Sequence, residues 1–156
     1  MIDSFASKQA LTTILQIIGT KEKICITNVY APHTVRERLA CLNQLENFLR
    51  PLDFKLKILA GDFNMILNLD EKRGGIRRLD LGSQAFQSMI DNLNLIDIPT
   101  KNGIHTWNNR RGGTRQIASR LDRFLLSEDL YLSSLETEVV IAPQVGSDHW
   151  PIVLTF

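Results

Sequence analysis

Near its carboxyl end the chain reads Gly146-Ser147-Asp148-His149-Trp150-Pro151, followed by the apolar run Ile152-Val153-Leu154. The apolar run predicts a strand, so an acid and a histidine stand at the entrance to that strand. Asp148 offers a hard oxygen ligand to Mg²⁺ or Mn²⁺, and His149 can donate a hydrogen bond to a phosphate oxygen. The pair predicts a site that handles phosphate, although Asp-His pairs also occur as ordinary solvated turn residues.

Three further segments place polar residues at or beside the ends of predicted strands. They are Asn28-Val29-Tyr30-Ala31-Pro32, Gly61-Asp62-Phe63-Asn64 and Ser119-Arg120-Leu121-Asp122-Arg123-Phe124. Strand ends are where sheet proteins commonly place their binding and catalytic residues. The four segments together therefore predict one composite site.

In this order the segments resemble the endonuclease/exonuclease/phosphatase superfamily with the DNase I-like fold, most closely the endonuclease domain of plant LINE-type (non-LTR) retrotransposons. The resemblance runs from about residue 8 to residue 156 and also rests on Glu71–Gly75 and Thr106–Arg111. It implies an α+β fold, a four-layer DNase I-like sandwich of two mostly antiparallel sheets flanked by helices, in one partial domain over residues 1–156.

One departure from the family concerns the amino-terminal part, where the family carries an early Asn and a metal-binding Glu. Only 27 residues precede Asn28 in this chain. Glu22 lies between two lysines in a predicted turn, and we do not assign it as the missing ligand. We expect an N-terminally truncated domain that lacks its first strands.

Asp62 and Asn64 follow the predicted strand Lys55–Ala60. If the extended backbone continues, their side chains point the same way. A carboxylate can take a proton from water while a neighbouring amide orients that water. The resemblance implies that Asp62 is the general base and Asn64 its partner. The alternative is a turn in which both polar side chains simply bond the backbone.

The resemblance also implies roles for Tyr30, Asp122, Asp148 and His149. Tyr30 contacts the phosphate, and Asp148 holds the divalent cation. Asp122 fixes the tautomer of His149 and favours its charged form. The alternatives are a core aromatic for Tyr30 and, for Asp122, a structural salt bridge with the arginines beside it in sequence.

The net charge of +1 conceals a basic segment. Residues 72–123 contain ten Lys or Arg and four acids, a balance of +6. This excess favours a polyphosphate-binding surface over an ordinary basic one. Arg110, Arg111 and Arg115 surround Gly112-Gly113 at a predicted hairpin tip, and we expect them to enter a DNA groove.

Five other residues are of types that often act in functional sites, but we predict no catalytic or metal-binding role for them. Trp107 is expected to be a packed aromatic, with a place in the lining of the groove as the alternative. His33 and His105 have no visible partner and are expected on the surface or in the core. Cys25 and Cys41 lack the spacing of a zinc site and are expected to be buried thiols.

Hydrophobic periodicity and capping residues predict the surrounding elements. Residues 67–82 are expected to form a long basic loop, and Gln9–Ile18 fits either a helix or a strand, with the resemblance favouring a strand. Thr34 and Ser83 are the expected helix N-caps. The other expected strands are Ile24–Tyr30, Lys55–Ala60, Leu95–Ile98, Ile104–Trp107, Ala118–Leu126, Glu138–Ala142 and Ile152–Phe156, and the expected helices are Thr34–Arg50, Ser83–Leu93 and Glu128–Ser133.

The resemblance implies a Mg²⁺- or Mn²⁺-dependent endonuclease domain of a retrotransposon that nicks DNA, with a reverse transcriptase domain downstream in an intact element. The alternatives are an inactive truncated relic that keeps the fold and the DNA-facing surface, and a phosphatase-type member that acts on a small phosphoester. A DNA substrate implies a nuclear location. No secretory signal is evident, and the apolar runs are too short to span a membrane.

Overall fold

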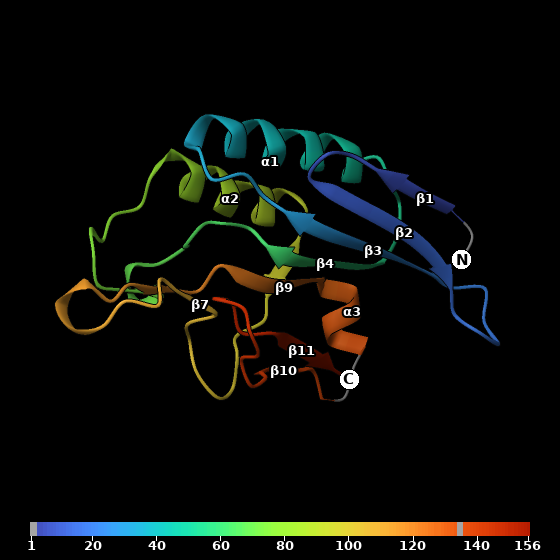
Figure 1. The fold of residues 1–156 in the computed structure, drawn as a ribbon. Coiled ribbons are helices and arrows are strands. Elements are labelled where there is room, and N and C mark those ends of the chain that lie inside the picture. The colour runs from blue at the N-terminus through green and yellow to red at the C-terminus, as the bar shows by residue number, and fades with distance from the viewer. Residues whose placement is uncertain (1–2, 134–135) are drawn as a thin grey trace.

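The computed structural model describes residues 3–133 and 136–156. A six-stranded sheet in the order β1-β2-β3-β4-β9-β6 crosses the molecule, with helices α1 and α2 on one face (Figure 1). The other face carries the two-stranded ladder β10-β11 and helix α3. A third ladder, β5-β8-β7, lies at one end of the large sheet. The helical layer, the large sheet and the small ladders agree with the predicted α+β, DNase I-like sandwich.

The helices and strands have the following bounds: β1 Asp3–Ala6, β2 Ala10–Gln16, β3 Lys23–Tyr30, α1 Val35–Leu49, β4 Leu56–Asp62, β5 Lys72–Arg73, α2 Leu81–Asn92, β6 Leu95–Asp97, β7 Trp107–Asn108, β8 Ala118–Ser119, β9 Asp122–Ser127, α3 Glu128–Ser133, β10 Glu138–Ile141 and β11 Ile152–Thr155. The ambiguous segment Gln9–Ile18 thus forms a strand. The expected loop over residues 67–82 contains a 3₁₀ turn, Leu69–Glu71, and strand β5. No helix of the described residues is both long and apolar enough to cross a membrane.

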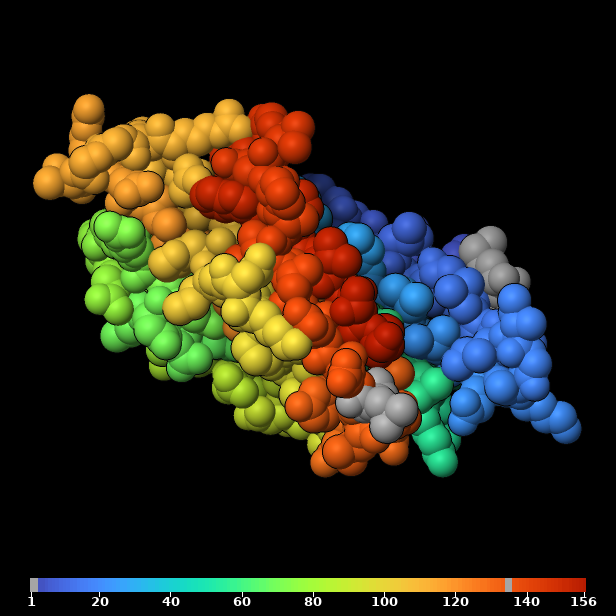
Figure 2. All heavy atoms as spheres, turned by 90° about the horizontal axis from the view of Figure 1, so that it is seen from below, coloured from blue at the N-terminus to red at the C-terminus, as the bar shows by residue number. Residues whose placement is uncertain are grey.

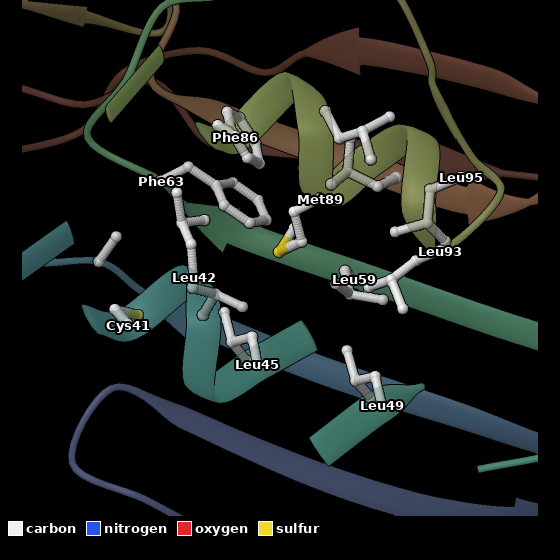
Figure 3. Close-up of a cluster of buried hydrophobic side chains, with 14 of the residues drawn as sticks. Cys41, Leu42, Leu45, Leu49, Leu59, Phe63, Phe86, Met89, Leu93 and Leu95 are labelled. Atoms are coloured by element: carbon white, nitrogen blue, oxygen red, sulfur yellow. The ribbon is translucent and has the colours of Figure 1, made fainter. Parts of the chain in front are cut away.

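Successive side chains of the central strands alternate between two apolar cores. Leu59 and Leu125 belong to the core beneath α1 and α2, whereas Ile58 and Leu126 belong to the core beneath α3 and β10. Figure 3 shows the first core, where side chains of α1, α2, β4 and β6 meet. The sheet is therefore packed between two apolar layers. This packing fixes the positions of the strand ends that carry the polar motifs.

Helix α1 starts where the sequence predicts, and helix α2 does not. The hydroxyl of Thr34 caps α1 by accepting a hydrogen bond from the Glu37 N–H at 3.3 Å. The predicted N-cap Ser83 is wrong, because α2 begins two residues earlier and Asp80 accepts the Ser83 N–H at 3.0 Å. Arg38 donates to the other oxygen of Asp80 at 2.6 Å, so a contact distant in sequence decides which residue caps.

The predicted continuous strand Ala118–Leu126 is in fact two strands in different sheets. The short β8 belongs to the end ladder and β9 to the large sheet. The break falls at Arg120, whose backbone N–H donates to the Glu71 carbonyl at 2.9 Å. Arg120 turns its side chain inward, and the chain passes from one sheet to the other.

A buried ion-pair cluster sits behind this break. Arg120 and Arg123 share the carboxylates of Glu71 and Asp97, with Arg120 2.7 Å from Asp97 and 3.0 Å from Glu71. Burial alone would raise the pKa of Glu71, but the bonds from Arg123 outweigh it and hold that pKa below its usual range. The prediction that counted both arginines in a polyphosphate-binding surface is therefore wrong, because both are buried and neutralised.

Candidate active site

Three adjacent strands bring Tyr30, Asp62 and Asp122 side by side. The parallel pairing of β3 and β4 sets Tyr30 opposite Asp62, and the antiparallel pairing of β4 and β9 sets Asp62 opposite Asp122. Residues opposite each other point to the same face of a sheet, so the three side chains form a row. Strand β4 runs two residues beyond its predicted end, which places Asp62 inside the strand instead of after it.

His149 reaches this row from the carboxyl-terminal segment. Its Nδ1 lies 2.9 Å from Oδ2 of Asp122, and its Nε2 lies 3.9 Å from Oδ2 of Asp62. The arginines beside Asp122 in sequence bind Glu71 and Asp97, so the alternative of a salt bridge to Asp122 does not hold. The imidazole is thus held between two carboxylates, with one hydrogen bond fixing its orientation.

The segment that carries His149 is positioned by pairing with the end ladder. His149 forms an isolated antiparallel bridge with Trp107, and the Trp150 N–H donates to the Thr106 carbonyl at 2.8 Å. The buried Thr106 hydroxyl accepts the N–H groups of Leu121 and Asp122, each at 3.0 Å. One threonine therefore fixes both the start of β9 and the strand beside His149, a role that sequence reasoning missed.

Asp62 is 8% exposed and lies in an environment that disfavours its charge. Burial, with a smaller contribution from the neighbouring Asp122 carboxylate, raises the pKa of Asp62 to about 6. The Asn64 N–H, which donates to Oδ1 of Asp62 at 2.8 Å, and the nearby His149 act in the opposite direction. A carboxylate with this pKa is ionised near neutral pH and still basic enough to accept a proton from water.

Asn64 does not continue the strand as predicted. Its φ of 51° lies in the left-handed region, and the chain turns directly after Asp62. The side-chain amide of Asn64 donates to the Ala31 carbonyl at 2.7 Å, while Arg38 donates to the Asn64 carbonyl at 2.7 Å. Asn64 therefore supports Asp62 through its backbone N–H, and its side chain ties two loops at the rim of the site.

Asp148 is exposed and accepts a hydrogen bond from the indole N–H of Trp107 at 2.8 Å. That bond holds the pKa of Asp148 below its usual range. The expectation that Trp107 is only a packed aromatic is incomplete, since the half-buried ring also orients this carboxylate. Nothing in the spacing of Trp107 and Asp148, 41 residues apart, predicts the contact.

A resident metal centre does not follow from these residues alone. No group of three or more His, Cys, Asp or Glu side chains that could hold a metal ion occurs in residues 3–133 or 136–156. Asp148 offers one ionised, exposed carboxylate. Mg²⁺ often binds through one or two carboxylates with water and substrate phosphate completing its shell, so the donor set fits an ion that enters together with a phosphate.

The three arginines expected at a hairpin tip lie on a broader loop. Residues 109–117 join β7 to β8 and include a 3₁₀ turn, Gly113–Arg115. Arg110 donates to the Gly146 carbonyl at 2.8 Å and lines a cleft of ≈ 240 Å³ together with Asp148. Arg111 and Arg115 are exposed further out on the loop. The loop is thus anchored beside the candidate site by one arginine and presents two others to solvent.

Tyr30 and His33 form a pair at the rim that sequence reasoning did not foresee. Tyr30 is 61% exposed, which excludes the alternative of a core aromatic. Its ring lies edge-on to His33, with ring centroids 6.3 Å apart. His33 is also close enough for its charge to lower the pKa of Asp62. The site therefore has an imidazole on each side of the row.

A family model described as "Endonuclease-reverse transcriptase" matches residues 24–153. Several solved structures share the fold at low sequence identity. An AP endonuclease from Leishmania major aligns with a TM-score of 0.73 at 21% identity, covering 92% of this chain and 53% of that one. A 3′ phosphatase from Neisseria, bound to product DNA hairpin, aligns with a TM-score of 0.70 at 18% identity, covering 95% of this chain and 64% of that one.

The endonuclease domain of TRAS1, a telomere-specific non-LTR retrotransposon, aligns with a TM-score of 0.65 at 18% identity. That alignment covers 94% of this chain and 62% of the TRAS1 domain. The chain thus spans between 53% and 64% of the length of these three structures. No curated protein sequence matches the chain.

Proposed function

The chain belongs to the endonuclease–reverse transcriptase family, and from this premise we propose that it hydrolyses phosphodiester bonds of DNA as the endonuclease domain of a retrotransposon. The fold shared with the TRAS1 endonuclease domain supports the proposal. In an intact element a reverse transcriptase domain would follow, and nicking of chromosomal DNA would place the protein in the nucleus.

One observation carries the proposal: the row of Tyr30, Asp62 and Asp122 with His149 bonded to its end. Hydrolysis of a phosphodiester needs a base for the attacking water and donors for the phosphate oxygens. The row supplies a partly buried carboxylate, an exposed phenol and an oriented imidazole within one face of the sheet. The carboxylates and the phenol come from strands that pack on the core, and the imidazole comes from a segment that pairs with Trp107 and bonds to Asp122, so the groups are preorganised for one substrate position.

Asp62 is the proposed general base. Its pKa of about 6 leaves it ionised at neutral pH. The Asn64 N–H holds one oxygen, and the other remains available to the attacking water. A base of this kind contributes about 10²- to 10⁴-fold to the rate.

His149 and Tyr30 are the proposed phosphate contacts. The Nδ1–H of His149 donates to Asp122, so Nε2 is left to face the substrate, and in the charged imidazole it donates to a phosphate oxygen. The exposed Tyr30 hydroxyl reaches the same face from β3. Asp122 acts through His149 by fixing its tautomer and orientation.

Asp148 is the proposed protein ligand of Mg²⁺ or Mn²⁺. When bound, the cation would neutralise charge on the phosphate and on the leaving oxygen. Asp148 would hold it through the carboxylate that Trp107 orients. Arg110, Arg111 and Arg115 would contact DNA phosphates beside the site, because their loop is anchored to the segment that carries Asp148.

Binding of DNA without turnover is a second candidate function. It is favoured by the lack, among the described residues, of three metal-ligating side chains in one place. In that case the arginine loop and the row of polar side chains would retain DNA affinity, and no bond would be cut.

A nicking assay with the purified chain on supercoiled plasmid in Mg²⁺ distinguishes the two candidate functions. The proposal predicts nicked circles that disappear in EDTA and with Asp148→Ala. The control Asp53→Asn, which changes an exposed acid before the start of β4 and so at the opposite end of that strand from Asp62, should nick normally. A folded chain that retards DNA in a gel but leaves the plasmid supercoiled would support binding without turnover and refute hydrolysis.

A further inference from the structure

A second cavity lies beside the two segments that carry Trp107 and His149 of the candidate active site. Its volume is ≈ 350 Å³, at the lower end of the range for small-molecule sites. Asn108 and Trp150, which directly follow Trp107 and His149 in sequence, form part of its lining. Figure 2 shows the segments concerned, in the 70s, the 100s and the 140s to 150, next to one another on one face of the molecule.

Four polar groups that line this cavity have no hydrogen-bond partner within the part of the chain that the structure describes. Nε2 of His105 is buried and unpaired. The guanidinium of Arg73, the side-chain amide of Gln116 and the indole N–H of Trp150 likewise make no hydrogen bond or ion pair within residues 3–133 and 136–156. The His105 nitrogen is buried, and a buried polar group is normally satisfied, so it points to a ligand that supplies its partner. Arg73 and Gln116 are exposed and Trp150 is half-buried, so these three side chains offer the same ligand donors that no described residue uses.

The charge and shape of the lining define the chemistry of that ligand. Arg73 and His105 are the two titratable residues that line the cavity. Burial, and to a lesser extent the nearby Arg73 charge, lowers the pKa of His105, so Arg73 carries the positive charge and His105 acts as a neutral hydrogen-bonding group. The Trp150 ring and the apolar Ile104 and Ile141 complete the lining with surface suited to a flat ring.

An anionic group and a flat heteroaromatic ring occur together in a nucleotide. We propose that this cavity binds one nucleotide of the DNA strand outside the bond that is cut, with the phosphate at Arg73 and His105 and the base against Trp150. The Gln116 amide then meets the polar edge of the base. This inference rests on the proposed function, because it assigns the site that holds the DNA beside the catalytic row.

The cavity can be tested without cleavage. Deoxythymidine monophosphate, thymidine and inorganic phosphate are titrated separately into the full chain without metal ions, and the NMR signals of the Trp150 indole N–H and the His105 ring are followed. The nucleotide should shift both signals and bind about tenfold or more tightly than either fragment, since base and phosphate contacts act together.

Two exposed arginines of the same basic segment provide a matched pair of variants. Arg73→Gln should weaken nucleotide binding by about tenfold or more, the loss expected for a charge-assisted hydrogen bond, whereas Arg78→Gln, which does not line the cavity, should leave it within about twofold. Both side chains are exposed, so neither change should impair folding.

The proposal is overturned if the nucleotide shifts neither signal, or if both variants weaken it equally, which would mean general attraction to a basic surface. Its failure is distinct from failure of the proposed function. A chain that nicks plasmid but fails this titration refutes the nucleotide cavity alone, and a chain that passes the titration but does not nick refutes hydrolysis while supporting the cavity.

Discussion

Replacing Asp62 by asparagine should stabilise the folded chain at neutral pH while removing the proposed general base. Folding transfers this carboxyl into a buried position beside Asp122, which raises its pKa from 3.8 to about 6. Each pKa unit corresponds to about 1.36 kcal/mol, so ionised Asp62 costs the fold about 3 kcal/mol above pH 6. The amide introduced by Asp62→Asn would be neutral at every pH and would keep an oxygen to accept the Asn64 N–H.

The sign of the pH dependence follows from the raised pKa. Well below pH 3.8 the carboxyl is protonated in both the folded and the unfolded chain, and Asp62→Asn should then have little effect. As the pH rises from about 4 to about 6, the unfolded chain loses its proton first, and the wild-type chain loses stability relative to the variant. The gap of about 3 kcal/mol should be complete at pH 8.

Urea unfolding followed by circular dichroism, at intervals from pH 4 to pH 8, measures this gap directly. Asp53→Asn serves as the control, because Asp53 is exposed and its replacement removes the same charge from the chain. A variant at Asp62 that is equal to or less stable than the wild type at pH 8 would refute the claim that the fold holds Asp62 at an energetic cost for its chemistry.

Three other predictions concern the supports of the site and the DNA surface. Thr106→Val should lower the free energy of unfolding by about 1–3 kcal/mol, because two partly buried N–H groups at the start of β9 lose their acceptor, and Thr106→Ser should recover most of that loss. Thermal unfolding measures the effect, and an unchanged melting temperature for Thr106→Val would count against the role of the hydroxyl. Arg123→Met should lower the free energy of unfolding by about 3–5 kcal/mol, because Glu71 and Asp97 lose one of their two arginine partners. Urea titration measures the change, and no loss of stability would mean that the ion-pair cluster is not needed for folding. Arg111→Gln and Arg115→Gln should each weaken duplex DNA binding and reduce the slope of log K against log salt concentration by about 1. Fluorescence anisotropy measures both quantities. An unchanged slope would show that the loop does not contact the DNA phosphates.

Local patterns in the sequence were sufficient where the structure is decided locally. Thr34 with Glu37 marks the start of α1, and alternation along Ile24–Tyr30 predicts which residues of β3 face each core. The end of β3 at Tyr30 could be placed for the same reason. By contrast, β4 runs past its predicted end to include Asp62, and the start of β9 at Asp122 lies inside what was predicted to be one continuous strand. The roles of these three residues still rest on the resemblance to a family and remain predictions.

Local sequence patterns did not predict the features that depend on contacts between residues far apart in the sequence. The choice of Asp80 over Ser83 as N-cap depends on Arg38, which is 42 residues away from Asp80. The break after β8 and the burial of Arg120 depend on Glu71, and a count of basic residues cannot tell a buried ion pair from an exposed cation. The hydrogen bond from Trp107 to Asp148 has no signature in sequence spacing.

The most direct test of the account is a double-mutant cycle on the pair Asp122 and His149, measured as single-turnover cleavage of a labelled DNA duplex in Mg²⁺. Because Asp122 acts only by orienting His149, the account predicts that Asp122→Asn and His149→Gln each slow cleavage and that the double variant is hardly slower than His149→Gln alone. Losses that multiply in the double variant, or a folded wild-type chain that cuts no DNA, would contradict it.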